Sequence, residues 1–431
     1  MALHTPSPTE KSNRLLRALD AARVRSLAFF WKSFPRVWLA LPAIVRKPLK
    51  QAKSLWDGRL MRSHQAALSE LIENHADTDP IIVFAPSLDW NVQLFQRPQQ
   101  LALAFARQGA LVFYPQPKPN FKKPPFQPLI DGLYLCNIVI SAFDILESPI
   151  VYVLTWNSGY VPRFRSPRIL YDYVDDTDVF YGDRQEIVKG HEYLVKEADY
   201  VVVTAEKLRL GLDGIRPDAI FCPNGVDYDQ FLPAREKEAG HPPEDLVDIV
   251  AQGKPIIGYY GALARWFDYD LLDRIAELRP DYAFVLIGPD YDGTVRAQKA
   301  LRRPNVHWLG VKPYRDLPAY LRYFDAATIP FVVSDITHAT SPLKLFEYMA
   351  GGKPVVVTPM HESMRYPGVL VGRDPEEFAA RLDEALTLRS EADYLETIDG
   401  VARSNTWDSR AMRILTALKR PPALKRQGET E

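Results

Sequence analysis

The sequence predicts an α/β protein of two doubly wound, Rossmann-like domains facing a cleft, with a basic N-terminal extension. Two observations lead to this prediction. From residue 81 onwards, short runs rich in β-branched and aromatic residues alternate with helical stretches, as buried parallel strands and their crossover helices do. This alternation stops at a polar, proline-rich and charged stretch, residues 232–252, and then restarts. The stretch is therefore the best candidate for a linker between two domains.

The runs that read as strands fall into two series. The first series comprises residues 81–86, 110–115, 133–140, 150–156, 168–174, 200–205 and 219–225. The second comprises residues 255–261, 283–289, 306–311, 326–332 and 354–359, and the fold is expected to close with a helix over 409–419. The predicted division is an extension over 1–78, a first domain over 79–240, a second domain with closing helices over 241–420, and a tail over 421–431.

Composition agrees with a globular chain. The 431 residues are 47% hydrophobic and 25% charged, and this length corresponds to two or three domains. The two cysteines, Cys136 and Cys222, are too few for a disulfide framework or a cysteine-rich zinc site, so a reducing compartment, the cytoplasm, is expected.

The net charge of −1 hides a basic segment near the N-terminus. Thirteen Lys or Arg residues lie between Lys11 and Arg62, against only Asp20 and Asp57, and they are interleaved with Trp and Phe. The longest uncharged apolar run, residues 37–45, is far short of the ~20 residues that span a bilayer. The pattern favours a segment lying on the surface of an anionic membrane. A disordered basic tail and helices packed on the main body are the alternatives. No nucleic-acid partner is expected, because nothing else in the chain resembles a nucleic-acid-binding fold.

The stretch SPLKLFEYMAGGKPVVVTP, residues 341–359, predicts a helix that leads into a buried strand. Ser341 is expected to be its N-cap and Pro342 its first residue, and Gly351 is expected to stop it. The next strand then follows at once, so the start of this helix is placed at a strand-end loop, where ligands bind in such sheets.

Leu343, Phe346 and Ala350 repeat with helical spacing and are expected to face the sheet. Lys344 and Glu347 then share another edge of the first turns. The positive end of a helix attracts anions, and Lys344 adds to it, whereas Glu347 suits the hydroxyl groups of a nucleotide ribose. From the residues alone, an ordinary surface ion pair between Lys344 and Glu347 is an equally good interpretation.

This stretch resembles the donor-binding sequence of GT-B glycosyltransferases of the retaining family 4/family 1-like group. Further matching segments occur in the same order, and they resemble the bacterial branch that builds surface and exopolysaccharides such as teichuronic acid. These segments are residues 90–114, 171–180, 196–208, 223–231, 258–272 and 284–289.

The resemblance implies a metal-independent glycosyltransferase without a cofactor. It would move a sugar, with retention, from a nucleotide diphosphate-sugar to an acceptor hydroxyl. Residues 79–240 would be the acceptor domain and residues 241–420 the donor domain. The expected partners are the nucleotide-sugar, a saccharide or lipid-linked acceptor, and an anionic membrane surface on the cytoplasmic side. A nucleotide-sugar epimerase on the same fold and a non-catalytic, membrane-associated sugar-binding subunit are the alternatives.

The resemblance also assigns residues on the donor side. Arg265 and Lys344 are the expected catalytic residues that stabilise the leaving diphosphate. The expected donor-binding residues are Gly261, Ser341, Pro342, Leu343 and Glu347. The chain departs from the family at Ala339, where a glutamate is usual, and at Ala262 and Phe267, where an arginine and a lysine are usual.

The expected acceptor-binding residues follow two strand ends of the first domain. A Trp among amides and an Arg suits a sugar face and its hydroxyls, although Trp90 and Phe95 packing onto the sheet is the alternative. These residues are Trp90, Asn91, Arg97, Asp172 and Asp175. The Asp-Thr-Asp sequence at 176–178 matches a metal-binding pattern of the other glycosyltransferase fold, but DYD recurs at three places, so no metal is expected.

Overall fold

The computed structural model describes residues 43–421 except 181 and 237–239, and it describes side chains from residue 57 onwards. It forms two compact units. Of the residues that the structure describes, one unit contains those up to Asn74 together with Ile138–Ile145, and the other contains His75–Asn137 and those from Leu146 onwards.

The first unit pairs a long helix with a short one. Helix α3 (Ala43–Asn74) packs on the 3-10 helix η1 (Ile140–Ile145), and Leu68 and Phe143 are fully buried. The backbone N–H of Val139 donates to Nδ1 of His64 at 3.2 Å. Of the segment expected to bind an anionic membrane, residues 11–42 lie outside the described residues. No helix in the described part of the chain is long and apolar enough to cross a membrane.

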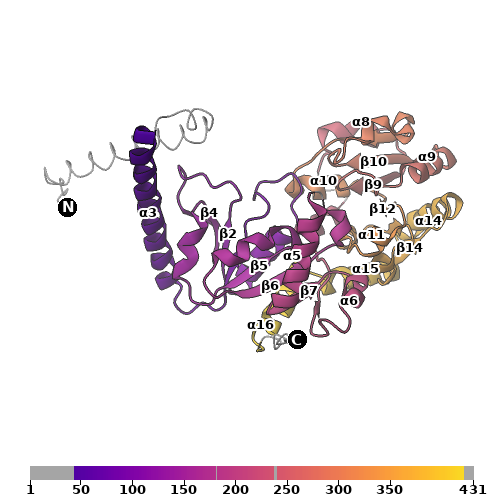
Figure 1. The fold of residues 1–431 in the computed structure, drawn as a ribbon. Coiled ribbons are helices and arrows are strands. Elements are labelled where there is room, and N and C mark those ends of the chain that lie inside the picture. Colours follow the sequence, from indigo (N-terminus) through magenta and orange to yellow (C-terminus); the bar gives the residue numbers. More distant parts are fainter. Residues whose placement is uncertain (1–42, 181, 237–239, 422–431) are drawn as a thin grey trace, which may run out of the picture. The chain divides into compact units, whose positions relative to one another are not determined.

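The second unit begins with an eight-stranded sheet. Its strands are β1 (Ile81–Phe84), β2 (Leu111–Pro115), β3 (Phe126–Ile130), β4 (Leu133–Cys136), β5 (Ile150–Val153), β6 (Arg168–Tyr173), β7 (Tyr200–Val203) and β8 (Ile220–Phe221). Their order is β3-β4-β2-β1-β5-β6-β7-β8 (Figure 1). All neighbours pair in parallel except β3, which is antiparallel to β4. Most of these strands are buried on both faces and read as continuous apolar runs, whereas β3 is largely exposed and was not predicted.

The same unit continues with a six-stranded sheet. Its strands are β9 (Ile256–Tyr260), β10 (Ala283–Ile287), β11 (Val306–Trp308), β12 (Ala326–Ile329), β13 (Val355–Val357) and β14 (Val369–Val371). Their order is β11-β10-β9-β12-β13-β14, and every pair is parallel. Two Rossmann-like domains are therefore present, which confirms the predicted fold class.

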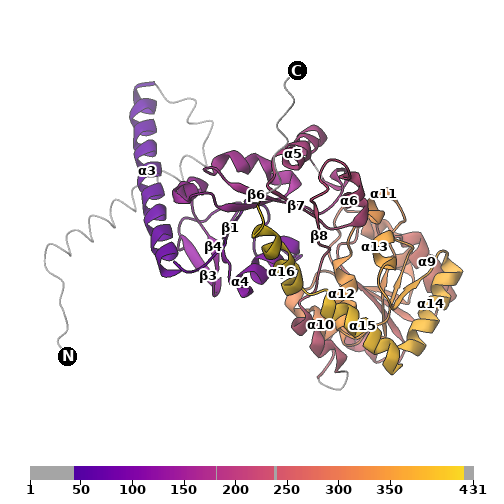
Figure 2. The ribbon, with the colours of Figure 1, turned by 90° about the horizontal axis from the view of Figure 1, so that it is seen from below.

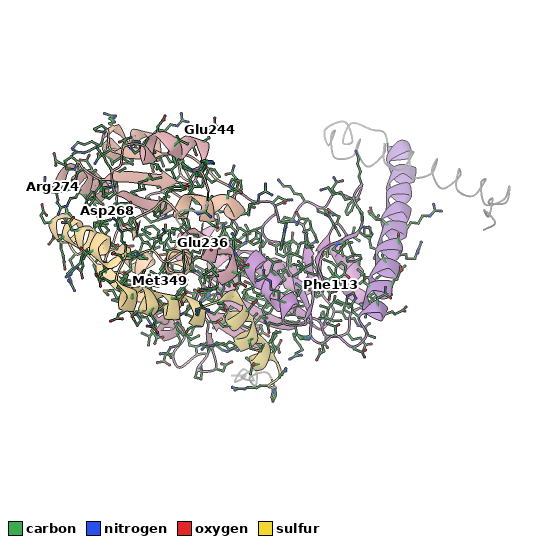
Figure 3. All side chains as sticks on the ribbon, turned by 180° about the vertical axis from the view of Figure 1, so that it is seen from behind. Phe113, Glu236, Glu244, Asp268, Arg274 and Met349 are labelled. Carbon is green, nitrogen blue, oxygen red and sulfur yellow. The ribbon has the colours of Figure 1, made fainter. Side chains whose placement is uncertain are left out.

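The α-helices of the second unit lie between the strands or, in the case of the last three, follow the final strand. They are α4 (Arg97–Arg107), α5 (Arg184–Glu197), α6 (Glu206–Gly211), α7 (Tyr228–Phe231), α8 (Val247–Val250), α9 (Tyr269–Leu278), α10 (Leu317–Leu321), α11 (Asp335–His338), α12 (Leu343–Ala350), α13 (His361–Met364), α14 (Pro375–Leu388), α15 (Ala392–Ser404) and α16 (Trp407–Leu418). Several begin at a side chain that accepts from a backbone N–H of the first turn, as Asp183, Asp268, Asp374 and Thr406 do. Phe113 of β2 and Met349 of α12, both labelled in Figure 3, are fully buried.

The chain crosses between the two domains twice, and the crossings are bonded together. The backbone N–H of Val226 donates to the Asn405 carbonyl, and that of Trp407 donates to the Val226 carbonyl, each at 3.0 Å. After the second crossing, α16 packs beside α4, and Trp407 and Ile414 join the buried cluster of the first sheet (Figure 2). The last helix, placed by sequence with the second domain, therefore completes the first.

The proline-rich stretch 232–252 is not a free linker. It contains the 3-10 helices η4 (Leu232–Arg235) and η5 (Glu244–Leu246) together with α8. Ala234, Leu246 and Ile249 are buried in the core of the second domain. The polar composition reflects short helices on the surface of that domain, so the linker interpretation was wrong.

Candidate functional site

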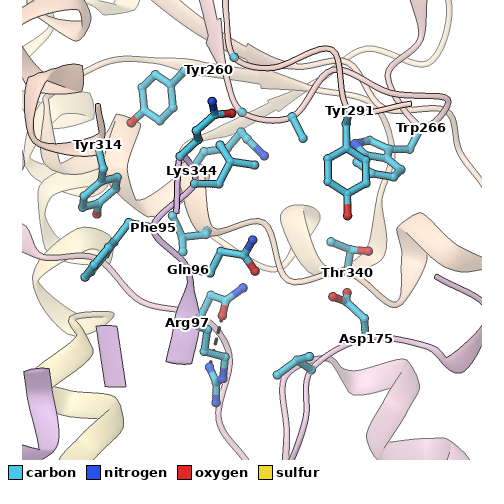
Figure 4. Close-up of a pocket in the computed structure, with 18 of the residues that line it drawn as sticks. Phe95, Gln96, Arg97, Asp175, Tyr260, Trp266, Tyr291, Tyr314, Thr340 and Lys344 are labelled. Atoms are coloured by element: carbon cyan, nitrogen blue, oxygen red, sulfur yellow. Dashed lines mark hydrogen bonds between the residues drawn. The ribbon is translucent and has the colours of Figure 1, made fainter. Parts of the chain in front are cut away.

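A cavity of about 600 Å³ is lined by loops from both domains of the second unit (Figure 4). Most of these loops follow the carboxyl ends of the strands, where doubly wound sheets bind ligands. In the first domain the lining residues lie within the segments 88–98, 154–156 and 174–180, together with Asn224, although not every residue of these segments lines the cavity. In the second domain they lie within the segments 259–266, 287–291, 311–317 and 331–347.

Helix α12 begins one residue later than predicted. Leu343 is its first residue and Pro342 occupies the N-cap position. The Ser341 hydroxyl accepts from the backbone N–H of Asn224 at 3.1 Å, and the Ser341 carbonyl accepts from Nδ2 of Asn224 at 2.7 Å. Ser341 therefore joins the helix start to the first interdomain crossing and caps nothing.

The later start also changes which residues face the sheet. Leu345, Phe346 and Met349 are fully buried in the second core. Leu343 instead lines the cavity and contacts the buried cluster of the first domain. The prediction that Leu343 faces the sheet was wrong, whereas the prediction for Phe346 and Ala350 agrees with their burial.

Lys344 lines the cavity and lies against two aromatic rings. Its Nζ is 4.9 Å from the centroid of Phe331 and 5.4 Å from that of Tyr259. Desolvation lowers the pKa of Lys344 to about 8, and the charge of Glu347 opposes this shift. Gly261 adjoins the lysine with a φ of 141°, and a Cβ there would lie 2.8 Å from Cε of Lys344. Only glycine fits this position without strain.

Glu347 is buried, with an exposed fraction of 1%. Its Oε1 accepts from the Tyr314 hydroxyl at 2.9 Å. Burial raises the pKa of Glu347 to about 7, although the Tyr314 hydrogen bond and the charge of Lys344 favour the ionised form. Within the described chain, Glu347 and Lys344 form no ion pair. The interpretation as a surface ion pair was therefore wrong.

Tyr314 also connects Glu347 to the first domain. Its ring stacks on Phe95, with centroids 5.6 Å apart and an interplanar angle of 23°. Phe95 comes from the loop after β1, and both rings line the cavity. Sequence reasoning missed Tyr314, although its position in the loop after β11 was a usable signal.

The other donor-side predictions lie differently. Arg265 is exposed and is not among the described residues that line the cavity, and its backbone N–H donates to Asp292 at 2.8 Å. Ala262 lines the cavity, whereas Ala339 is buried outside it. The structure thus brings Gly261, Lys344 and Glu347 together and leaves Arg265 apart.

Arg97 and Asp172 form a buried ion pair. Nε of Arg97 lies 2.7 Å from Oδ2 of Asp172, and Nη2 lies 3.1 Å from Oδ1. The exposed fractions of the two side chains are 5% and 0%. The Tyr152 hydroxyl also donates to Asp172, and Nη1 of Arg97 donates to the Pro223 carbonyl at 3.1 Å. Both charges are therefore engaged in contacts within the protein, although Arg97 also lines the cavity.

Trp90 and Asn91 lie beside the cavity lining without joining it. Trp90 packs edge-on against Phe95 and Tyr114, with centroids 5.4 and 5.1 Å away. Asn91 is exposed, and its backbone N–H donates to Asp89 at 3.0 Å. The alternative, in which Trp90 packs onto the sheet, describes the structure better than a sugar-binding Trp90.

Asp175 does line the cavity, and Figure 4 shows its carboxylate pointing inward. Burial raises the pKa of Asp175 to about 7, helped by the charges of Asp176 and Asp172 and opposed by Arg97. In the described part of the chain, no three His, Cys, Asp or Glu side chains are grouped so as to hold a metal ion.

Comparison with known proteins identifies the domain that contributes Gly261, Lys344 and Glu347. Residues 254–387 match the family described as glycosyl transferases group 1. These residues are therefore similar to a glycosyltransferase group 1 domain. TuaH of Bacillus subtilis (strain 168), named as a teichuronic acid biosynthesis glycosyltransferase, is 29% identical over 245 residues, which are 54% of this chain and 60% of TuaH. The match thus spans about 60% of the length of this relative.

Solved structures with low sequence identity to this chain share its fold. Sucrose-phosphate synthase from Thermosynechococcus elongatus has a TM-score of 0.59 at 14% identity, covering 79% of this chain and 98% of that one. Anabaena HepE in complex with UDP and glucose has a TM-score of 0.53 at 14% identity, covering 78% of this chain and 98% of that one. The fold is GT-B, as the resemblance implied.

The buried ion pair yields a stability prediction. Asp172→Ala leaves the Arg97 guanidinium buried without its partner, and we expect it to lower the free energy of unfolding by about 3–5 kcal/mol. Asp178→Ala is the matched control, because it breaks the exposed pair of Asp178 with Arg184 and costs at most about 1 kcal/mol. Urea unfolding followed by fluorescence measures both. Equal losses in the two variants would contradict a structural role for Asp172.

Proposed function

We propose that this chain is a glycosyltransferase of cell-surface polysaccharide biosynthesis. It transfers a sugar from a nucleotide diphosphate-sugar to an acceptor hydroxyl, with retention of configuration. The observation that carries the proposal is that Lys344 and Glu347 of the group 1 domain line one cavity without pairing with each other. The name of TuaH and the complexes of HepE with UDP and glucose support the choice of reaction and donor class.

Donor binding follows from the chemistry of the cavity wall. The Glu347 carboxylate, oriented by Tyr314, accepts hydrogen bonds from the ribose hydroxyls. The diphosphate lies against the positive end of α12 and Lys344, where Gly261 leaves room for it. Burial makes these contacts stronger than they would be in water.

The reaction exchanges one C–O bond for another. The bond from the anomeric carbon to the diphosphate oxygen breaks, and the acceptor oxygen bonds to the anomeric carbon on the same face. The proton of the acceptor hydroxyl passes to the leaving diphosphate. Lys344 and the helix end stabilise the negative charge that grows on this group. Arg265, which is exposed, takes no part in this scheme.

The remaining partners are part of the same proposal. The acceptor is a saccharide or a lipid-linked saccharide, and the chain works on the cytoplasmic side of the membrane with the basic residues 11–62 on an anionic surface. The chemistry assigned to Lys344 and the helix end requires no resident cofactor or metal.

The first test measures nucleoside diphosphate release. We expect the full chain to release UDP, GDP or ADP from the matching sugar nucleotides only when a saccharide or lipid-linked acceptor is present. Release or epimerisation of the donor without acceptor would point instead to the epimerase. Nucleotide binding without turnover under any condition would point to the non-catalytic subunit.

The second test separates the roles of the two charged residues. Glu347 contacts a part of the donor that does not react, so Glu347→Gln should raise donor KM with little change in kcat. Lys344 faces charge that grows in the transition state, so Lys344→Ala should lower kcat by on the order of 10²–10³-fold. Arg274→Ala, which removes an exposed arginine on α9, is the control. Wild-type kinetics in both site variants would remove these two residues from the mechanism.

The third test uses pH. Lys344 is protonated below its pKa of about 8, and Glu347 is ionised above its pKa of about 7. Affinity for the donor should therefore be highest between these values and fall by up to about tenfold per pH unit on either side. Calorimetry with UDP-glucose measures this, since its diphosphate lacks the terminal phosphate that titrates near pH 6. Lys344→Ala should abolish the alkaline fall and Glu347→Gln the acidic one; persistence of both falls would contradict the assignment.

A further inference from the structure

The cavity has a second wall, which the donor contacts leave unused. It is formed in the first domain by the loops after β5 and β6, which contain the 3-10 helices η2 (Thr155–Arg163) and η3 (Thr177–Val179). Trp156 and Phe180 lie on this wall with ring centroids 4.9 Å apart, and Trp156 is 37% exposed. A large aromatic ring that remains exposed inside a cavity offers a flat apolar face to a ligand.

The aromatic pair has an apolar surround with one acidic group. Leu88, Leu154, Val174 and Val179 complete this wall. The Asp175 carboxylate points into the cavity from the same wall, toward Thr340 of the second domain (Figure 4). It makes no hydrogen bond or ion pair with any other residue that the structure describes. Its acceptor capacity is therefore available to a ligand.

Charge divides the cavity into two regions. Among the described lining residues, the basic ones are Arg97, Lys312 and Lys344, and the acidic ones are Asp175 and Glu347. Arg97 is already paired with Asp172, and Lys312 and Lys344 belong to the second domain. An anion is thus attracted to the Lys344 wall, whereas on the Trp156 wall it meets an unpaired carboxylate in a poorly solvated place.

Building on the proposed function, we propose that Trp156, Phe180 and Asp175 form the acceptor subsite and that this subsite selects an uncharged sugar ring. The C–H face of the ring lies on Trp156, and its hydroxyl groups donate to Asp175. A sugar that carries a carboxylate or a phosphate is rejected by like-charge repulsion. Because burial raises the pKa of Asp175 to about 7, this rejection should strengthen as pH rises through that value.

The test uses saturation-transfer NMR on the full chain loaded with UDP. The probes are methyl glucoside and methyl glucuronide, which differ in a carboxylate, with methyl N-acetylglucosaminide as a second neutral sugar. We expect both neutral glycosides to bind, and methyl glucuronide to bind about tenfold more weakly than methyl glucoside at pH 8, with a smaller difference at pH 6. Asp175→Asn should remove this difference at both pH values.

Matched variants separate the subsite from general effects. Trp156→Ala should abolish the saturation transfer from the protein to every glycoside, and Trp156→Phe should restore part of this signal. Asp178→Asn removes the same charge three residues along the chain, and Tyr193→Ala removes an exposed aromatic ring; both side chains lie outside the cavity lining and should change nothing. Three results would each overturn the proposal. They are an unchanged saturation-transfer signal in Trp156→Ala, binding of methyl glucuronide that equals or exceeds that of methyl glucoside, and no saturation transfer to any glycoside. Calorimetry with UDP is a separate measurement, and its failure would count against the proposed donor site alone.

Discussion

The buried guanidinium of Arg97 is the contact on which the arrangement of the cavity depends. It pairs with Asp172 at the end of β6 and donates to both Pro223 and Asn224 in the first interdomain crossing. Asn224 in turn bonds to Ser341, directly before the helix that presents Lys344. One hydrogen-bonded path thus runs from a strand of the first domain to the helix start of the second. Because a buried charge is costly without its partners, this path fixes the two elements together.

The two walls of the cavity share this anchor but differ in electrostatic character. On the second-domain wall Lys344 lies beside Glu347, whose carboxyl group, with a pKa of about 7, is only partly ionised near neutral pH. This combination accepts an anion with hydroxyl groups attached. On the first-domain wall apolar side chains surround Asp175. The stacking of Phe95 on Tyr314 connects the walls, since the same tyrosine donates to Glu347. A rearrangement of the loop after β1 would therefore move Tyr314 and change its hydrogen bond to Glu347.

Local sequence patterns were sufficient to predict the fold class and part of the candidate site. Apolar runs marked most strands because parallel strands are buried on both faces, and spacing along one helix placed Lys344 and Glu347 on a shared edge. The contacts of the first-domain wall could not be predicted, because they join residues that are distant in sequence. Arg97 and Asp172 are 75 residues apart, so no local pattern shows that each neutralises the other. Trp156 and Phe180 likewise belong to different loops, and only the pairing of β5 with β6 brings them together.

The final helix has a consequence for synthesis on the ribosome. Trp407 and Ile414 belong to the core of the domain whose strands are completed at Phe221, and the whole second domain is encoded between these points. The first domain therefore emerges with part of its apolar core uncovered, and its folding cannot finish before the last helix leaves the exit tunnel. The second domain, whose strands are contiguous in sequence, has no such requirement. In this chain the domain that is translated first is therefore the one whose core is completed last.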